Sequence, residues 1–133
     1  MPTKQFGYAG MRRIWLSEEN YHSFNNFIYF GLCGVTRSDG FLRAAGVVCG
    51  VVIEKHFSEV CKNNSISISK KNPTIADYND ALKENVYDIL EWRRIQRLGD
   101  IRNLCGHNKE REPTKEEVFE LISGTERIIK TIF

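Results

Sequence analysis

Two residues in the last third of the chain could together act on a phosphate group. Arg102 and His107 are separated by four residues in the segment Arg-Asn-Leu-Cys-Gly-His. An arginine offers a fixed charge and a fork of N–H donors to an anion, and a histidine can move a proton near neutral pH. Asn103 follows the arginine and could orient either partner by a hydrogen bond. This set of side chains suits chemistry on a phosphodiester.

These side chains could cleave RNA without further groups. If two copies of the segment lined one cleft, His107 could remove the proton of a ribose 2′-hydroxyl, and Arg102 could stabilise the charge on the phosphoryl oxygens. The 2′-oxygen would then attack its own phosphate without a metal ion. DNA lacks this hydroxyl and would be spared.

Simpler roles are open for the same residues. His107 could bond the free carbonyl groups of a helix end, and Arg102 could form an ion pair with Asp100 or with an acid on the last helix. Cys105 and His107 could be two metal ligands, or a thiol nucleophile with its base. The other Cys and His residues show no recognised ligand spacing, and Cys105 lies on the apolar side of its helix.

Two helices must position the segment. Apolar residues at near-helical spacing predict a helix from near Tyr87 to Gly106, where the glycine acts as a stop signal. After Pro113, Thr114 and Glu117 form a capping box, which predicts a final helix over 115–132.

Upstream, the pattern predicts three further helices and a loose basic arm over 1–16. The first helix covers 17–33. Phe41 to Cys61 is too long for one strand and is expected to form the central helix, with His56 on its surface. Gly46 and Gly50 lie four residues apart there, which favours close approach of another helix, within the monomer or in a dimer. Thr74 is expected to cap a short helix ending near Asn85.

Composition places the chain among globular proteins. It has 133 residues, 41% of them hydrophobic and 27% charged, and a net charge of +2. Between Trp92 and Arg111, six basic and two acidic residues give a local charge of +4. The four cysteines form no C-x-x-C pair, and Met1 to Gly10 lacks an apolar signal-peptide core, so reduced thiols and a cytoplasmic location are expected. The apolar run from Ala44 to Ile53 is too short to span a bilayer, so no membrane association is expected.

The Arg-Asn-x-x-x-His segment at a helix end, followed by a capped final helix, resembles the Arg-x4-6-His motif of the HEPN superfamily. The resemblance covers about 88–133. It implies an all-α homodimer with a composite site in which Arg102 and His107 are catalytic. HEPN toxins paired with a nucleotidyltransferase antitoxin commonly carry a tyrosine two residues after the histidine. Here that position is Lys109, which departs from that pairing.

Together, these observations predict one HEPN-like helical domain over 1–133, with about five helices, that forms a homodimer. The expected function is a metal-independent endoribonuclease of a toxin or anti-phage defence system, controlled by an antitoxin or by a larger defence protein. No metal or cofactor is expected. The alternative is a non-catalytic HEPN-like module for dimerisation or for binding RNA or a partner. The predicted catalytic residues are Arg102, His107 and Asn103, and the candidate RNA contacts are Arg97, Lys109 and Arg111.

Overall fold

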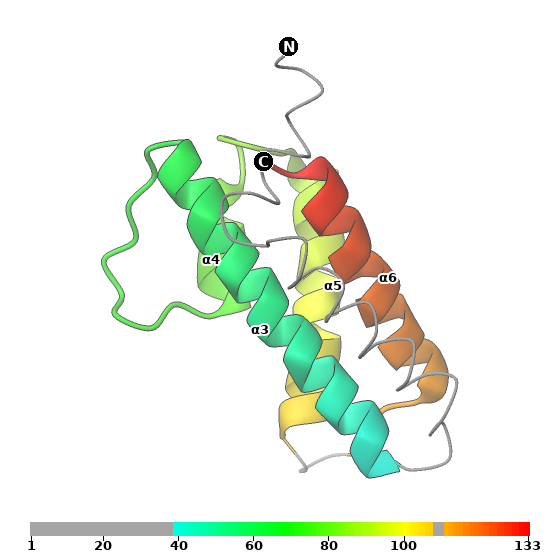
Figure 1. Ribbon diagram of the computed structural model, residues 1–133. Helices are drawn as coiled ribbons and strands as arrows, with labels where there is room; N and C mark the ends of the chain where they lie inside the picture. The colour runs from blue at the N-terminus through cyan, green and yellow to red at the C-terminus, as the bar shows by residue number, and fades with distance from the viewer. Residues whose placement is uncertain (1–38, 108–110) are drawn as a thin grey trace, which may run out of the picture.

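The computed structural model describes residues 39–107 and 111–133, and this part of the chain is helical (Figure 1). Its helices are α3 (Asp39–Asn63), α4 (Ile75–Leu82), α5 (Ile89–Gly106) and α6 (Lys115–Thr131). No β-strand occurs in these two ranges, so the all-α prediction is confirmed. The predicted arm at 1–16, the predicted helix at 17–33 and Lys109 lie outside the described residues.

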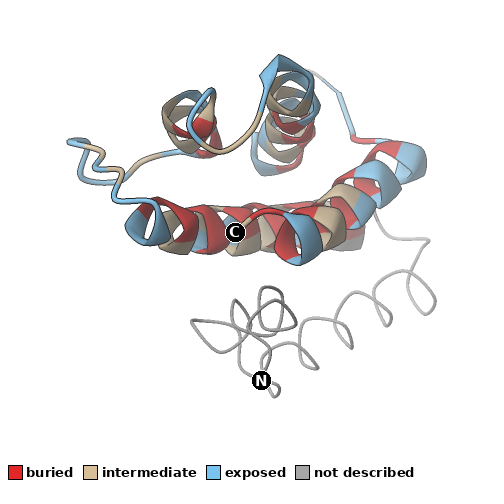
Figure 2. Cartoon of the chain, turned by 90° about the horizontal axis from the view of Figure 1, so that it is seen from above, coloured by how far each residue is buried: buried red, intermediate tan, exposed pale blue. Residues whose placement is uncertain are grey.

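α3 is the central helix of this bundle, as predicted. It contacts each of the other three helices. Seen from above, α4 and α5 form a layer over α3 and α6, and the buried residues gather between the layers (Figure 2). Ile53, Phe57 and Val60 are fully buried on α3. The segment that was too long for one strand is therefore a helix, and α5 likewise contacts all three of its neighbours.

The glycine pair of α3 does allow a helix to approach, and that helix is α5 of the same chain. A methyl group added to Gly46 would lie 2.8 Å from Cβ of Cys105. One added to Gly50 would lie 2.6 Å from Cγ of Arg102. The close approach is therefore confirmed, and it belongs to packing within the monomer. Gly124 of α6 serves α5 in the same way, since a methyl there would lie 2.5 Å from Leu98.

Both predicted helix caps, at Thr74 and Thr114, are present, and each forms a capping box. The hydroxyl of Thr74 accepts from the backbone N–H of Asp77, and the hydroxyl of Thr114 accepts from that of Glu117. α5 begins at Ile89, two residues later than predicted, where Asp88 is the N-cap. α4 ends at Leu82 rather than near Asn85, because the chain leaves helical geometry in the two following residues.

One prediction on α3 is wrong: His56 does not lie on the surface. It is fully buried, and its Nε2 atom donates to the carbonyl oxygen of Ile132 at 2.8 Å. The polar run before Phe57 concealed this, because the end of α6 covers that side of α3. None of the helices in the described ranges is long and apolar enough to cross a membrane.

Candidate active site at the end of α5

The last turn of α5 carries the predicted catalytic segment. His107 is the C-cap residue, in extended conformation (φ −122°, ψ 118°), and its backbone N–H donates to the carbonyl oxygen of Asn103 at 2.9 Å. The side chains of Asn103 and His107 are exposed. Both polar groups are therefore accessible to a ligand.

Arg102 lies between α5 and α3. Its side chain crosses α3 at Gly50, and its Nη1 atom lies 3.2 Å from the place that a Cβ would occupy at Gly106. The absence of a side chain at Gly50 and Gly106 therefore makes room for the guanidinium beside the residue that precedes His107. The described structure shows no hydrogen bond between the side chains of Arg102 and His107.

Arg102 forms no ion pair with the part of the chain that the structure describes. Its Nε atom is buried and has no hydrogen-bond partner among residues 39–107 and 111–133. In the same ranges no carboxylate oxygen lies within 4.0 Å of its guanidinium. Neither of the ion pairs considered for it, with Asp100 or with an acid of α6, is formed. A partly buried cation without a partner is unfavourable unless something else binds to it.

The neighbouring arginines behave differently. Four of them pair with glutamates at N–O distances of 2.6–3.2 Å: Arg43 with Glu112, Arg97 with Glu120, Arg111 with Glu117 and Arg127 with Glu91. These four arginines thus have a glutamate in direct contact, whereas Arg102 has none within residues 39–107 and 111–133.

Arg43 is a residue that sequence reasoning missed. Its Nη1 atom donates to the carbonyl oxygens of Leu104 and Cys105 at 2.9 and 3.1 Å, and its Nη2 atom donates to that of Arg111 at 3.3 Å. It therefore binds the C-terminal carbonyls of α5 and the start of the segment that leads to α6. The available signal was a cation inside an apolar helical run, because such a residue needs partners.

The two candidate RNA contacts in the described ranges, Arg97 and Arg111, are each paired with a glutamate of α6. Arg97 lies on the α6 side of α5 and donates twice to Glu120, whereas Arg102 lies on the α3 side. Arg111 forms a two-bond pair with Glu117 at 2.8 and 2.7 Å. Arg97 and Glu120 are both exposed, so their ion pair is weak, whereas Glu117 is buried and its bonds to Arg111 are stronger. The RNA-binding role of Arg97, Lys109 and Arg111 stays a prediction.

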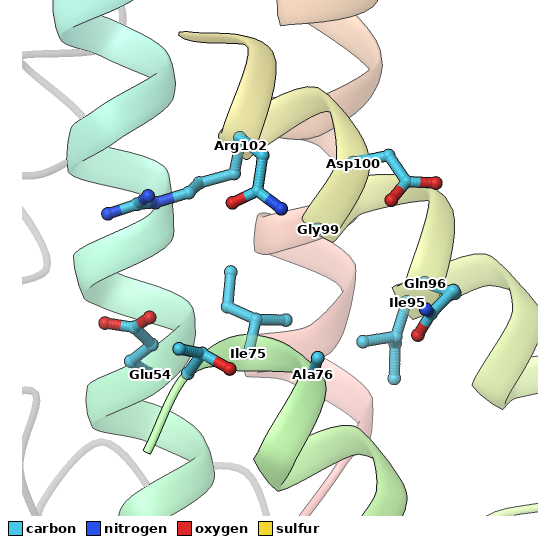
Figure 3. Close-up of a pocket in the computed structure, with 10 residues that line it drawn as sticks. Glu54, Ile75, Ala76, Ile95, Gln96, Gly99, Asp100 and Arg102 are labelled. Atoms are coloured by element: carbon cyan, nitrogen blue, oxygen red, sulfur yellow. The ribbon is translucent and has the colours of Figure 1, made fainter. Parts of the chain in front are cut away.

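A pocket of about 220 Å³ opens beside Arg102 and Asn103 (Figure 3). Glu54 of α3, Ile75 at the start of α4 and Gln96 of α5 form other parts of its lining. Partial burial raises the pKa of the Glu54 carboxyl, although the Arg102 charge and the backbone N–H of Ile75 lower it. The pocket thus combines a carboxyl group, amide groups and an apolar wall.

The thiol of Cys105 does not suit nucleophilic chemistry. It is buried against Gly46, and burial raises its pKa, so the thiolate is disfavoured. Within residues 39–107 and 111–133, no group of three or more His, Cys, Asp or Glu side chains is arranged to hold a metal ion. Cys105 is therefore a core residue in this structure.

No protein-family model matches the chain, and no match was found among curated proteins or solved structures. The HEPN resemblance consequently rests on the motif and its placement between α5 and α6.

Proposed function

We propose that the protein is a metal-independent endoribonuclease whose active site is completed across a homodimer. The observation that carries the proposal is Arg102. It is partly buried, it lies at the helix end that bears His107, and within residues 39–107 and 111–133 its buried Nε atom has no hydrogen-bond partner. An anion held by Arg102 would compensate the unpaired charge, and a phosphodiester is the anion that His107 could cleave.

The reaction needs a base and an acid, and each copy of the chain offers one histidine at this position. His107 of one copy takes the proton of the 2′-hydroxyl, and the 2′-oxygen forms a bond to phosphorus. The bond from phosphorus to the 5′-oxygen breaks, and the leaving oxygen receives a proton from the imidazolium of His107 in the second copy. Arg102 stabilises the charge on the phosphoryl oxygens, and the exposed Asn103 amide donates to one of them. The products are a 2′,3′-cyclic phosphate and a 5′-hydroxyl.

Cleavage of labelled RNA in EDTA tests the proposal. We expect the wild type to cut and His107→Ala to lose at least about 100-fold in rate, because it lacks the proton carrier. Lys130→Ala is the matched control, since it removes an exposed cation at the other end of α6. Equal cutting by wild type and His107→Ala would refute the role of His107 and favour a binding module. A monomer at tens of micromolar in light scattering would refute the composite site.

A toxin or defence role for this activity predicts an effect on cells. Expression of the wild type should arrest bacterial growth because RNA is cut, whereas Arg102→Ala should not. Growth curves of the two strains at equal protein levels measure the difference. Equal growth of both, with cleavage confirmed in the test tube, would separate the ribonuclease activity from a toxic role.

A further inference from the structure

The pocket beside Arg102 contains two opposite charges that do not neutralise one another. Glu54 lies four residues after Gly50, so it is one turn along α3 from the point where Arg102 crosses. Figure 3 shows the Arg102 guanidinium above the Glu54 carboxylate beside α3, with the Ile75 side chain next to both. Their charges interact, yet in the described structure no nitrogen of Arg102 is within 4.0 Å of the carboxylate. A ligand between them could bond to both.

The remaining polar groups restrict what that ligand can be. The Oε1 atom of Gln96 already accepts from Asn79 at 3.2 Å, which leaves its N–H2 group as a donor. Asn103 adds an exposed amide at the pocket rim. The site therefore presents carboxylate acceptors at Glu54 and at the exposed Asp100, and N–H donors from Gln96 and Asn103 of α5. A matching ligand carries adjacent N–H donors on one edge and acceptors on another.

The rest of the lining suits a flat group. Ile75, Ala76 and Gly99 offer an apolar surface from α4 and α5. At Gly99, even an added methyl would only reach van der Waals distance from Ile75, 3.6 Å, so the wall there is open and smooth. The volume of about 220 Å³ is below the roughly 300–1,000 Å³ of pockets for drug-sized ligands, and it suits one ring system.

We propose that this pocket binds a guanine base, with the carboxylate of Glu54 accepting from its N1–H and N2–H2 groups. Guanine is the RNA base with two adjacent donors that match both oxygens of a carboxylate, and its O6 and N7 atoms are acceptors for the donors of α5. Adenine presents one donor and one acceptor on the corresponding edge. Proteins read unstacked RNA bases through such edges, with apolar side chains on the faces. Glu54 is then a specificity-determining residue.

One part of this proposal rests on the proposed ribonuclease function, namely that the bound guanine is next to the phosphate that is cleaved. Since Arg102 lines this pocket and also lies at the helix end that bears His107, a guanine bound there would be next to the phosphate that Arg102 holds. Cleavage should then occur beside guanosine. Recognition of the base itself does not require cleavage, so it can be measured on an inactive enzyme.

Binding of mononucleotides to the full-length chain tests the pocket. We expect guanosine 3′-monophosphate to bind at least about tenfold more tightly to His107→Ala than the adenosine, cytidine and uridine nucleotides do. Inosine 3′-monophosphate lacks the N2 amino group and should bind with an intermediate affinity. Adding Glu54→Gln should remove the guanosine preference, whereas Glu59→Gln on the same helix should not. Thermal unfolding verifies that each variant is folded.

Each result has a separate meaning for the two proposals. Equal binding of the four nucleotides, no binding of any, or a preference unchanged in Glu54→Gln would overturn the guanine pocket. RNA cutting without preference for guanosine would keep the ribonuclease and overturn the proposed position of the pocket beside the cleaved phosphate. Guanosine-selective binding by a protein that never cuts RNA would keep the pocket and refute the ribonuclease.

Discussion

At the scale of single residues, Arg102 and Arg43 show how differently one side-chain type is used here. Arg43 bonds three carbonyl oxygens and a carboxylate, so its charge and its donors serve the fold. Arg102 packs its stem on Gly50 and leaves its Nε donor without a partner. Sequence alone could single out Arg102 by its spacing from His107. It could not identify Arg43, whose partners lie about 60 residues away in the chain.

Replacing Arg102 by methionine should preserve the fold. Methionine keeps apolar contact with Gly50 and removes a donor that has no partner, so the free energy of unfolding should stay within about 1 kcal/mol of the wild type or rise. RNA cleavage should be lost. Urea unfolding and the EDTA cleavage assay measure the two effects. A loss of stability well beyond that range would show that Arg102 is a structural residue.

The same replacement at Arg43 should have the opposite effect on stability. Arg43→Met leaves the carbonyls of Leu104 and Cys105 without their donor and breaks the pair with Glu112, which should cost about 2–3 kcal/mol. Arg43→Lys should recover part of this lost stability, because an ammonium group can still donate hydrogen bonds. The comparison is made in the same urea titrations. Unchanged stability in Arg43→Met would contradict the capping role.

At the scale of elements, local sequence rules predicted where helices begin, whereas the buried His56 and the pocket depend on tertiary contacts. The capping boxes at Thr74 and Thr114 act within four residues, so sequence located both helix starts. The glycines of α3 indicated a close neighbour but not which helix it was. The burial of His56 depends on the end of α6, and the pocket at Glu54 needs three helices to meet. Neither leaves a periodic signal in the chain.

The two glycines of α3 should respond differently to alanine. At Gly46 the new methyl meets the buried Cys105, so we expect a loss of about 1–3 kcal/mol from overpacking. At Gly50 it meets the Arg102 stem from Cγ outward, so that side chain must shift, and the gain of about 1 kcal/mol in helix propensity offsets part of this cost. Gly50→Ala should therefore lose less stability than Gly46→Ala but be poor in cleavage. Unimpaired cleavage by folded Gly50→Ala would argue against the position of Arg102.

At the scale of the whole molecule, the described helices form one bundle around α3, and its buried ionisable groups link stability to pH. Burial lowers the pKa of His56, so folding favours its neutral form. The Arg111 hydrogen bonds and the backbone N–H of Thr114 lower the pKa of Glu117 to about 2. The assembly of two such bundles stays a prediction, since dimerisation depends on surface complementarity that periodicity does not encode.

These two groups should act in separate pH ranges. The His56 contribution is present above its unfolded pKa of 6.5 and should be lost as the pH falls below that value. The Glu117 contribution is present above its unfolded pKa of 4.5 and should be lost as the pH falls to about 2. Urea unfolding at a series of pH values measures the free energy of unfolding. Its dependence on pH should become weaker below pH 6.5 in His56→Gln and weaker between pH 4.5 and about 2 in Glu117→Gln. Variant curves parallel to the wild type would contradict these assignments.

The contacts of Arg43 also have a consequence for the geometry of the loop that contains His107. One guanidinium holds the carbonyl groups of both Cys105 and Arg111, so it fastens the two ends of a short span of chain at a single point. The cost of bringing these two anchor points together is thereby met on folding. Adding a residue between Cys105 and Arg111 would leave both bonds to Arg43 in place and would change the length of the segment that contains His107. Loop length, rather than loop composition, should therefore be what this site tolerates least.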